Sequence, residues 1–234
     1  MLLVISSRYD HSASALVEQW RHLDARLLTC LDLSTAGWRY YPGDPGNSRA
    51  VVGGEIVPFE HIAGALICIP AITKWEVVHI EPSDRGYVAA EMNAFLTAWL
   101  SEATFPVVNR PTPSCLMGPN WSQTRWIREA VRAGLQYRMA AKASSRRDSP
   151  RGPSTGHAVV TVVGDRCFGD AAGLLMLQAR RLAAAAGVHS LTVVFNGPES
   201  DSEFVQAYPA VDLAQTEVAT ALFDCFPVSA AAFA

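Results

Sequence analysis

Short apolar runs alternate with amphipathic stretches through the first half of the sequence. The runs with the length and composition of buried strands are LLVIS at 2–6, RLLTCLDL at 26–33 and GALICIP at 64–70. Helical patterns occupy 14–23 and 85–102 between and after them. The apolar face of the second helix consists of Ala89, Met92, Phe95, Leu96 and Trp99. Such alternation predicts a mostly parallel sheet that helices cover.

Turn-forming residues punctuate the rest of this half. SRAVVGGEIVPF at 48–59 is typical of a strand pair that turns at Gly53 and Gly54. FPVVNRP at 105–111 is a strand that ends in proline, and WSQTRWIREAVRAG at 121–134 is a helix that stops at Gly134.

The composition changes at 142–156, where KASSRRDSPRGPSTG contains no large apolar side chain. A core cannot be built from such residues, so we expect a flexible linker with a basic character. After it, 157–170 reads as two strands joined at Gly164 and Asp165, and Ala171–Ala186 as a helix. Two further strands, at 190–197 and 203–209, and a last helix at 217–226 complete an α+β unit. The predicted domains are 1–110, a helical connector at 111–141, the linker at 142–156, and 157–234.

Charge and hydropathy exclude several classes of protein. The net charge of the 234 residues is −3, so no global basic field attracts nucleic acid or anionic lipid. The N-terminal MLLVISSRYD has no basic region and too short an apolar run for a signal peptide. No apolar stretch approaches the roughly 20 residues that span a bilayer. We therefore expect a soluble cytoplasmic protein.

The cysteines and histidines do not form a metal-binding pattern. Five cysteines are widely scattered with no CxxC pair, which favours reduced, mostly buried thiols. The six histidines are dispersed as well, so a metal site is not expected.

Two blocks of the sequence resemble the ATP-grasp family, in its RimK-like and peptide-maturase branch. The first runs from EMNAFLTAWL through PVVNRP at 106–111 to Ala133-Gly134-Leu135. The second comprises VVTVVGDRCFGD, ARRLAAAAGVHSLTVVFNG and EFVQAYPAVDL. The resemblance implies an α/β fold with an N-terminal, mostly parallel pre-ATP-grasp-like domain. A truncated ATP-grasp-like α+β layer would follow it.

The chain departs from the pattern of that family at its functional positions. The resemblance places an acidic metal ligand at Val194, and the Glu and Asn ligands of the next strand at Gln206 and Tyr208. It places an arginine at Val159. Magnesium prefers carboxylate and phosphate oxygen, which valine cannot supply, and glutamine and tyrosine are poor substitutes. These positions are therefore predicted to be lost.

The phosphate-binding lysines of the family have no counterpart either. The resemblance implies a subdomain between the two blocks whose strands supply them, and only the linker stands there. The whole sequence has two lysines, Lys74 and Lys142, and no glycine-rich phosphate loop.

A loop before the long helix is a second candidate site. It holds Glu76, His79, Glu81 and Asp84, and Arg85 follows. Ser83 or Asp84 is expected to cap the helix. Loops at the ends of parallel strands often bind ligands, so Glu76, His79, Asp84 and Arg85 are predicted ligand contacts. Asn109 and Arg110, after the next strand, are predicted to join them.

Asp10-His11-Ser12 could suggest a nucleophile beside a base. Adjacent residues at a helix start do not face one another, however, so we expect Asp10, Ser12 or Ser14 to cap the helix instead.

Three hypotheses for function follow. The first is a non-catalytic ATP-grasp-like protein that needs no cofactor and acts as an accessory subunit. It would bind a ligase, a peptide or a small molecule, and form a homo- or hetero-oligomer through the surface that the lost subdomain leaves open. The second is an active ATP-dependent carboxylate-amine ligase that uses ATP and Mg²⁺ with a rebuilt site. Its new metal ligands would come from Asp165, Asp170, Glu203 and Asp212. A purely structural α/β module is the third.

Overall fold

A computed structural model describes residues 1–138 and 156–226 of the chain. It is a mixed α/β fold, as the sequence predicted, and consists of two compact units. Among the described residues, the first unit is formed by Met1–Asn120 together with Asp212–Phe226, and the second lies within Trp121–Val211. The predicted linker at 142–156 lies outside the described residues except for Gly156. The predicted domain limits stay a prediction.

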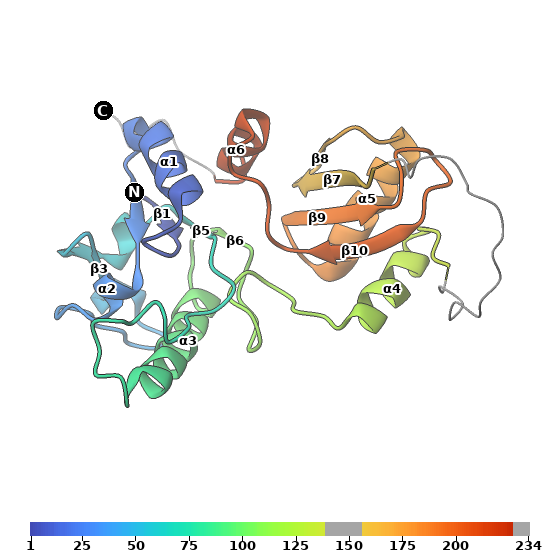
Figure 1. Ribbon diagram of the computed structural model, residues 1–234. Coiled ribbons are helices and arrows are strands. Elements are labelled where there is room, and N and C mark those ends of the chain that lie inside the picture. Colours follow the sequence, from blue (N-terminus) through green and yellow to red (C-terminus); the bar gives the residue numbers. More distant parts are fainter. Residues whose placement is uncertain (139–155, 227–234) are drawn as a thin grey trace. The chain divides into compact units, whose positions relative to one another are not determined.

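A parallel sheet forms the centre of the first unit (Figure 1). Its strands are β1 (Leu2–Ile5), β2 (Ala25–Leu28), β5 (Gly64–Ile67) and β6 (Val107–Val108), in the order β2-β1-β5-β6. Leu2 is in register with Ala25 on one side and Gly64 on the other. All residues of β1 and β5 are buried, because both faces of the sheet are covered. The predicted parallel sheet is confirmed.

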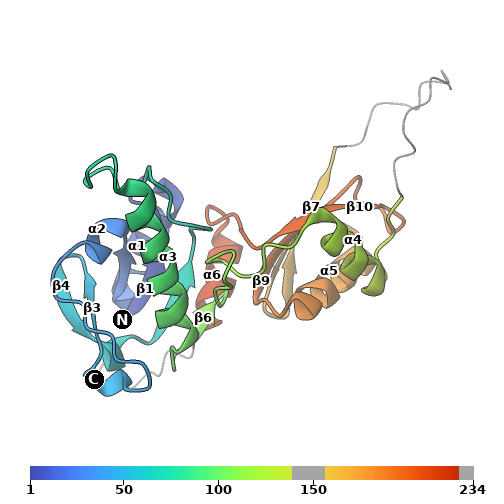
Figure 2. The same cartoon turned by 90° about the horizontal axis from the view of Figure 1, so that it is seen from below.

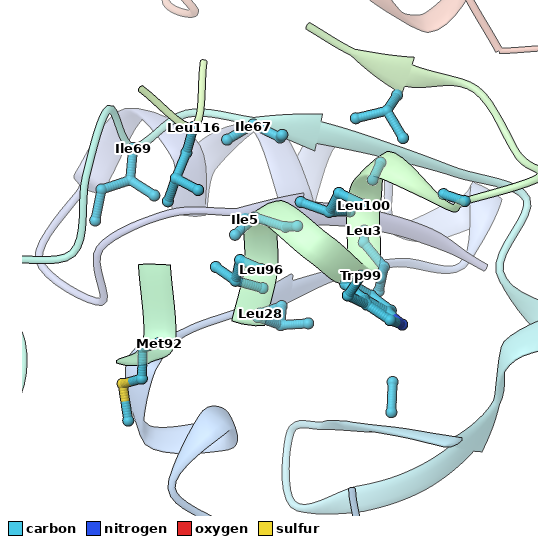
Figure 3. Close-up of a cluster of buried hydrophobic side chains, with 14 of the residues drawn as sticks. Leu3, Ile5, Leu28, Ile67, Ile69, Met92, Leu96, Trp99, Leu100 and Leu116 are labelled. Carbon is cyan, nitrogen blue, oxygen red and sulfur yellow. The ribbon is translucent and has the colours of Figure 1, made fainter. Parts of the chain in front are cut away.

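Helices cover opposite faces of this sheet. α1 (His11–Gln19) packs on one face, and α3 (Arg85–Ser101) packs on the other, where Figure 3 shows Leu96, Trp99 and Leu100 against Leu3 and Ile5. The predicted apolar face of α3 is buried, apart from Phe95, which is partly exposed. Trp99 is fully buried, and its ring centroid lies 5.7 Å from that of Phe59.

The strand predicted at 26–33 is shorter than expected. β2 ends at Leu28, and α2 (Cys30–Leu33) follows directly. The Thr29 backbone N–H donates to Asp32 Oδ2 at 2.9 Å, and the Thr29 hydroxyl donates to the same oxygen. This capping box starts a helix within a run whose apolar composition alone indicates a strand.

The predicted strand pair after α2 is present as a hairpin. β3 (Arg49–Val52) pairs antiparallel with β4 (Glu55–Pro58). Gly53 and Gly54 have φ values of 61° and 79° at the turn. A two-residue hairpin turn of this kind needs positive φ, which glycine adopts at little cost. Single turns of 3₁₀ helix occur at η1 (Arg21–Leu23), η2 (Pro45–Asn47) and η3 (Phe59–His61).

The second unit is an antiparallel sheet with helices on one face (Figure 2). The strands β7 (Ala158–Val163), β8 (Arg166–Phe168), β9 (Ser190–Phe195) and β10 (Phe204–Tyr208) are ordered β10-β9-β7-β8. Its core is formed with α5 (Gly173–Ala186) and α4 (Gln123–Arg132). Gly134 has a φ of 96° just after α4, and its N–H donates to the Val131 carbonyl. The predicted C-cap is confirmed.

The last described helix, α6 (Thr216–Phe223), belongs by its contacts to the first unit. The ring of Trp20, after α1, lies 5.9 Å from that of Phe223 and 6.4 Å from that of Phe226. Gly64 leaves room for Phe226, because a Cβ there would lie 3.0 Å from Phe226 Cε1 and closer still to Cδ1. Within 1–138 and 156–226, no helix is long and apolar enough to cross a membrane.

Candidate functional site

One face of the second sheet carries the positions that the family resemblance singled out. Val160 and Val193 point into the core under α5, so the alternate residues of each strand point to the other face. These are Val159 on β7, Val194 on β9 and Gln206 on β10. We call this surface the open face of the sheet.

The register of the strands brings these residues into two adjacent rows. Val159 pairs with Val194, which pairs with Gln206. Thr161, Thr192 and Tyr208 form the next row. Directly opposite side chains in antiparallel strands have Cβ atoms about 4.5–5.5 Å apart. The four positions singled out by the resemblance, which span 50 residues of sequence from Val159 to Tyr208, therefore lie side by side on one face of the sheet.

The open face carries uncharged side chains, some apolar and some polar. Val159 is 44% exposed and Tyr208 40% exposed, whereas Val194 is buried to 7%. The Thr192 hydroxyl donates to the Ala210 carbonyl at 2.6 Å, so the chain after β10 covers part of the second row. None of the six side chains in the two rows is charged. The rows offer apolar contacts, an amide, a phenol and the buried hydroxyls of Thr161 and Thr192, and they lack the carboxylate oxygens that hold Mg²⁺. As a donor set, they do not fit a magnesium ion or a magnesium nucleotide.

The acidic residues proposed as replacement metal ligands do not converge. Asp165 lies in the turn after β7, and Glu203 lies just before β10, beside the opposite end of the sheet. Six residues of β7 separate these ends, which is about 20 Å at 3.4 Å per residue. Asp170 follows β8, at the sheet edge opposite β10. Throughout the part of the chain that the structure describes, no group of three His, Cys, Asp or Glu side chains could hold a metal ion.

Two of these acids have local roles. Glu203 Oε1 lies 3.2 Å from Arg138 Nε, and its backbone N–H donates to Asn196 Oδ1. Asp212 accepts the Ala214 backbone N–H at 3.0 Å and the Gln215 side-chain amide at 3.1 Å. Both carboxylates stabilise turns beside strands or helices.

A polar cluster lies at the carboxyl ends of the parallel strands in the first unit. Ser7 Oγ donates to Glu76 Oε2 at 2.9 Å, and His79 Nε2 lies 2.7 Å from Ser34 Oγ at the end of α2. The loop predicted from the sequence therefore does lie over this edge of the sheet, held through Glu76 and His79. Sequence reasoning missed Ser7 and Ser34. A serine pair directly after the first apolar run was the available signal for Ser7.

Two further predicted ligand contacts, Arg85 and Arg110, lie at opposite ends of α3. Arg85, at the start of α3, donates to the carbonyls of Ile80 and Val78. Arg110 donates to the carbonyls of Leu100, Ser101 and Ala103 at the end of the same helix. The helix of 17 residues is about 25 Å long at 1.5 Å per residue. The two guanidinium groups thus bind main-chain oxygen at opposite ends and do not form one site.

Asp84 and Asn109 complete the predicted set. Asp84 is the N-cap residue of α3, but its side chain accepts from the Ser83 hydroxyl instead of a backbone N–H of the helix. Asn109 is buried, and its amide donates to the Met117 carbonyl at 3.2 Å. Of the six predicted ligand contacts, Glu76 and His79 lie in the loop before α3, and Arg85 binds the carbonyls on either side of His79. Arg110 lies at the far end of the helix and does not join them.

The start of α1 has the capping arrangement expected for a helix. Asp10 Oδ1 accepts the Ala13 backbone N–H at 3.0 Å, and Oδ2 accepts the Ser6 hydroxyl at 2.8 Å. Both carboxylate oxygens are therefore engaged in structure, as the capping prediction required.

The nearby thiols are not poised as nucleophiles. Burial, together with the charge of Glu76, raises the pKa of Cys30 to about 12. Burial and the charge of Asp10 raise the pKa of Cys68 to about 12 as well. Because the thiolate is the reactive form, these two cysteines are inert at neutral pH. All five cysteines are free, as predicted. Only Cys30 is fully buried and the other four are partly buried, so the expectation of mostly buried thiols is met only in part.

Comparison with solved structures identifies the fold. No protein-family model and no characterised protein sequence matches the chain. The macrocyclase MdnC bound with precursor peptide MdnA, from Microcystis aeruginosa MRC, aligns with a TM-score of 0.68 and 9% identity. The alignment covers 97% of this chain and 99% of that one. The macrocyclase MdnB of the same organism aligns with a TM-score of 0.66 and 12% identity, over 97% and 99% of the two chains.

A third similar structure is a RiPP-associated ATP-grasp ligase from Chryseobacterium gregarium, in complex with ADP and a leader and core peptide. Its TM-score is 0.66 at 8% identity, with 96% of each chain covered. At these identities the likeness concerns the fold alone. The chain has an ATP-grasp-like fold over nearly its whole length, as the resemblance of the two blocks predicted.

Proposed function

We propose that this chain is a non-catalytic protein with an ATP-grasp-like fold that binds a peptide as the accessory subunit of an ATP-dependent peptide-modifying system. The observation that carries the proposal is the row Val159–Val194–Gln206 on the open face of the second sheet. The resemblance assigns an arginine and metal ligands to this row, and its side chains are two valines and a glutamine. Catalysis of phosphoryl transfer depends on cations that neutralise the developing charge, and this row holds neither a cationic side chain nor a carboxylate ligand for a metal cation.

The peptide part of the proposal is supported by the bound state of similar folds. The MdnC structure contains a precursor peptide, and the Chryseobacterium gregarium structure contains a leader and a core peptide. Val159 and Tyr208 are exposed on the open face. An exposed valine and an exposed tyrosine supply the apolar and amphipathic area on which peptide side chains pack.

We also propose that the chain acts in the cytoplasm as part of a homo- or hetero-oligomer. Coverage of the open face by a second subunit would remove Val159 and Tyr208 from water. Sedimentation at a series of concentrations tests this part. A species that sediments as a monomer throughout, both alone and with extract from its source cells, would contradict the oligomer.

The central test is thermal unfolding with four additions: buffer, Mg²⁺, ATP, and Mg²⁺ with ATP. A ligand at a hundred times its Kd stabilises a folded protein by about 2.7 kcal/mol, which corresponds to about 5–11 °C at 2–4 °C per kcal/mol for a chain of this size. The proposal predicts the same Tm in all four samples. A rise that needs both metal and nucleotide would instead support the alternative, an active carboxylate-amine ligase with a rebuilt site.

A further inference from the structure

Two arginines lie directly opposite each other beside the hairpin of the first unit. Arg39 and Arg49 form an antiparallel bridge, in which the Arg39 N–H donates to the Arg49 carbonyl at 3.1 Å and the Arg49 N–H donates to the Arg39 carbonyl at 2.7 Å. Residues that exchange both hydrogen bonds have Cα atoms about 5.5 Å apart and side chains on the same face. The geometry therefore holds two guanidinium groups on one surface.

This arrangement is electrostatically unfavourable as it stands. Like charges directly opposite on paired strands destabilise the pair. Arg49 Nη1 donates to the carbonyls of Gly46 and Ser48. The guanidinium of Arg39 makes no hydrogen bond or ion pair with any residue in 1–138 or 156–226. An anion between the two side chains would relieve the repulsion and use the free donors of Arg39.

A cavity of about 310 Å³ lies at this pair, lined by Arg39, Tyr41, Asp44, Asn47 and Arg49. Asp44 is already engaged, because its carboxylate accepts the backbone and side-chain N–H groups of Asn47 at 3.3 Å and 2.7 Å. Two guanidinium groups and one carboxylate give the cavity a net charge of +1. A single negative charge neutralises it, which favours one carboxylate over a doubly charged phosphate.

An aromatic cavity shares a wall with the first one. Tyr41 also lines a neighbouring space of about 340 Å³, together with Tyr40, Phe59 and Trp99. Glu102 lines this space as well, and its carboxylate is already engaged, because it accepts the Gly43 backbone N–H at 3.2 Å. The aromatic walls of this space suit an apolar side chain. A ligand that carries a carboxylate beside an apolar group can therefore place the charge at the arginines and the apolar group behind Tyr41.

We propose that Arg39 and Arg49 bind a carboxylate of the peptide partner, next to an aromatic or other large apolar residue. The inference rests on the proposed function for the partner being a peptide. The guanidinium of Arg39 donates two parallel hydrogen bonds to the carboxylate, the geometry in which arginine binds such groups most strongly. The carboxylate comes from either the C-terminus of the peptide or an acidic side chain.

Titration calorimetry of the full chain with three small peptides tests the carboxylate. The probes are N-acetyl-phenylalanine with a terminal carboxylate, N-acetyl-glutamyl-phenylalaninamide with a side-chain carboxylate, and N-acetyl-phenylalaninamide with none. We expect at least one of the first two to bind at least tenfold more tightly than the third. The stronger of the two identifies the source of the carboxylate. Equal affinity for all three probes, or no binding by any, would overturn the inference.

Substitutions at Arg39 test the residue itself. We expect Arg39→Gln to weaken the binding of the preferred probe at least tenfold. Arg39→Lys should lie between this variant and the wild type, because lysine keeps the charge but loses the two-pronged geometry. Arg21→Gln is the matched control, since Arg21 is also an exposed arginine and, within residues 1–138 and 156–226, its side chain pairs with Glu18 alone. Unchanged binding in Arg39→Gln would refute the assignment.

The outcome is independent of the test of the proposed function. A magnesium-nucleotide shift in Tm would refute the accessory role while leaving carboxylate binding intact. Conversely, equal binding of all three probes together with an unchanged Tm would refute the carboxylate site and leave the accessory role standing.

Discussion

Gly169 allows the start of β7 and the chain after β8 to approach closely, and its replacement by alanine should strongly destabilise the second unit. Its φ is 128°, a conformation that is costly for residues with a Cβ. A Cβ at this position would overlap the carbonyl oxygen of Val159 and lie 3.2 Å from its carbonyl carbon. Val159 belongs to the candidate row on the open face, so the substitution displaces the backbone at one end of that row.

The expected magnitude follows from two contributions. Holding a non-glycine residue in a disfavoured backbone conformation costs about 1–3 kcal/mol. Displacing the two segments also weakens a hydrogen bond of the β7–β8 ladder, at about 0.5–1.5 kcal/mol for each bond. The sum is about 3 kcal/mol, which lowers Tm by about 6–12 °C at 2–4 °C per kcal/mol.

Gly173→Ala is the matched control, four residues further along. Gly173 is the first residue of α5, has no positive φ, and a Cβ there would meet no atom within 4 Å. Alanine at such a position stabilises a protein by about 0.4–1 kcal/mol, because it reduces the entropy of the unfolded chain. Scanning calorimetry of both variants gives the two shifts. A Gly169→Ala protein that melts within 1 °C of the wild type would refute the close approach of Gly169 to Val159.

Three further predictions concern the first unit. Gly64→Ala should lower stability by about 1–3 kcal/mol, as overpacking does, since the added methyl group overlaps Phe226. Hydrogen exchange should show less-protected amides in α6, and unchanged protection would contradict the prediction. Asp10→Ala should lower the free energy of unfolding in urea by about 2 kcal/mol, because it removes the cap of α1 and leaves the buried Ser6 hydroxyl without its acceptor. In a Ser12→Ala control, the free energy of unfolding should fall by no more than a few tenths of a kcal/mol. Burial raises the pKa of Cys68 in the folded protein to about 12, above the value of about 8.5 in the unfolded chain. The contribution of this thiol to stability is therefore complete below about pH 8.5 and is lost as the pH rises towards 12. Rapid iodoacetamide labelling of Cys68 in the folded protein at pH 8 would disprove this.

The fold and the activity rest on different kinds of evidence in this chain. Its backbone matches the folds of a macrocyclase and of a ligase, each solved with a bound peptide, whereas function depends on which side chains occupy the site. The open face keeps the strand register of a three-strand surface while its side chains are valine, threonine, glutamine and tyrosine. This combination underlies our proposal that the chain binds a peptide and does not transfer a phosphoryl group.

Local sequence patterns were sufficient wherever the interactions are local. The period of α3, the glycine turn between β3 and β4 and the glycine end of α4 all depend on residues within a few positions of one another. The parallel sheet could be predicted because both faces of its strands are buried, which requires continuous apolar runs such as LLVI. The end of β2 was missed, since the capping box of Thr29 and Asp32 competes with an apolar pattern that also suits a strand.

Tertiary structure alone decided which distant residues meet. The sequence placed Val159, Val194 and Gln206 on strands, but only the register of β7, β9 and β10 sets them side by side. Likewise, Trp20 meets Phe223 across some 200 residues, and Arg39 faces Arg49 through a bridge without any motif. Such contacts arise from the packing of whole elements, and chain-local propensity carries no information about the partner. The sequence therefore determined the elements and the uncharged side chains of the Val159–Val194–Gln206 row, and the packing of those elements determined which side chains share a surface.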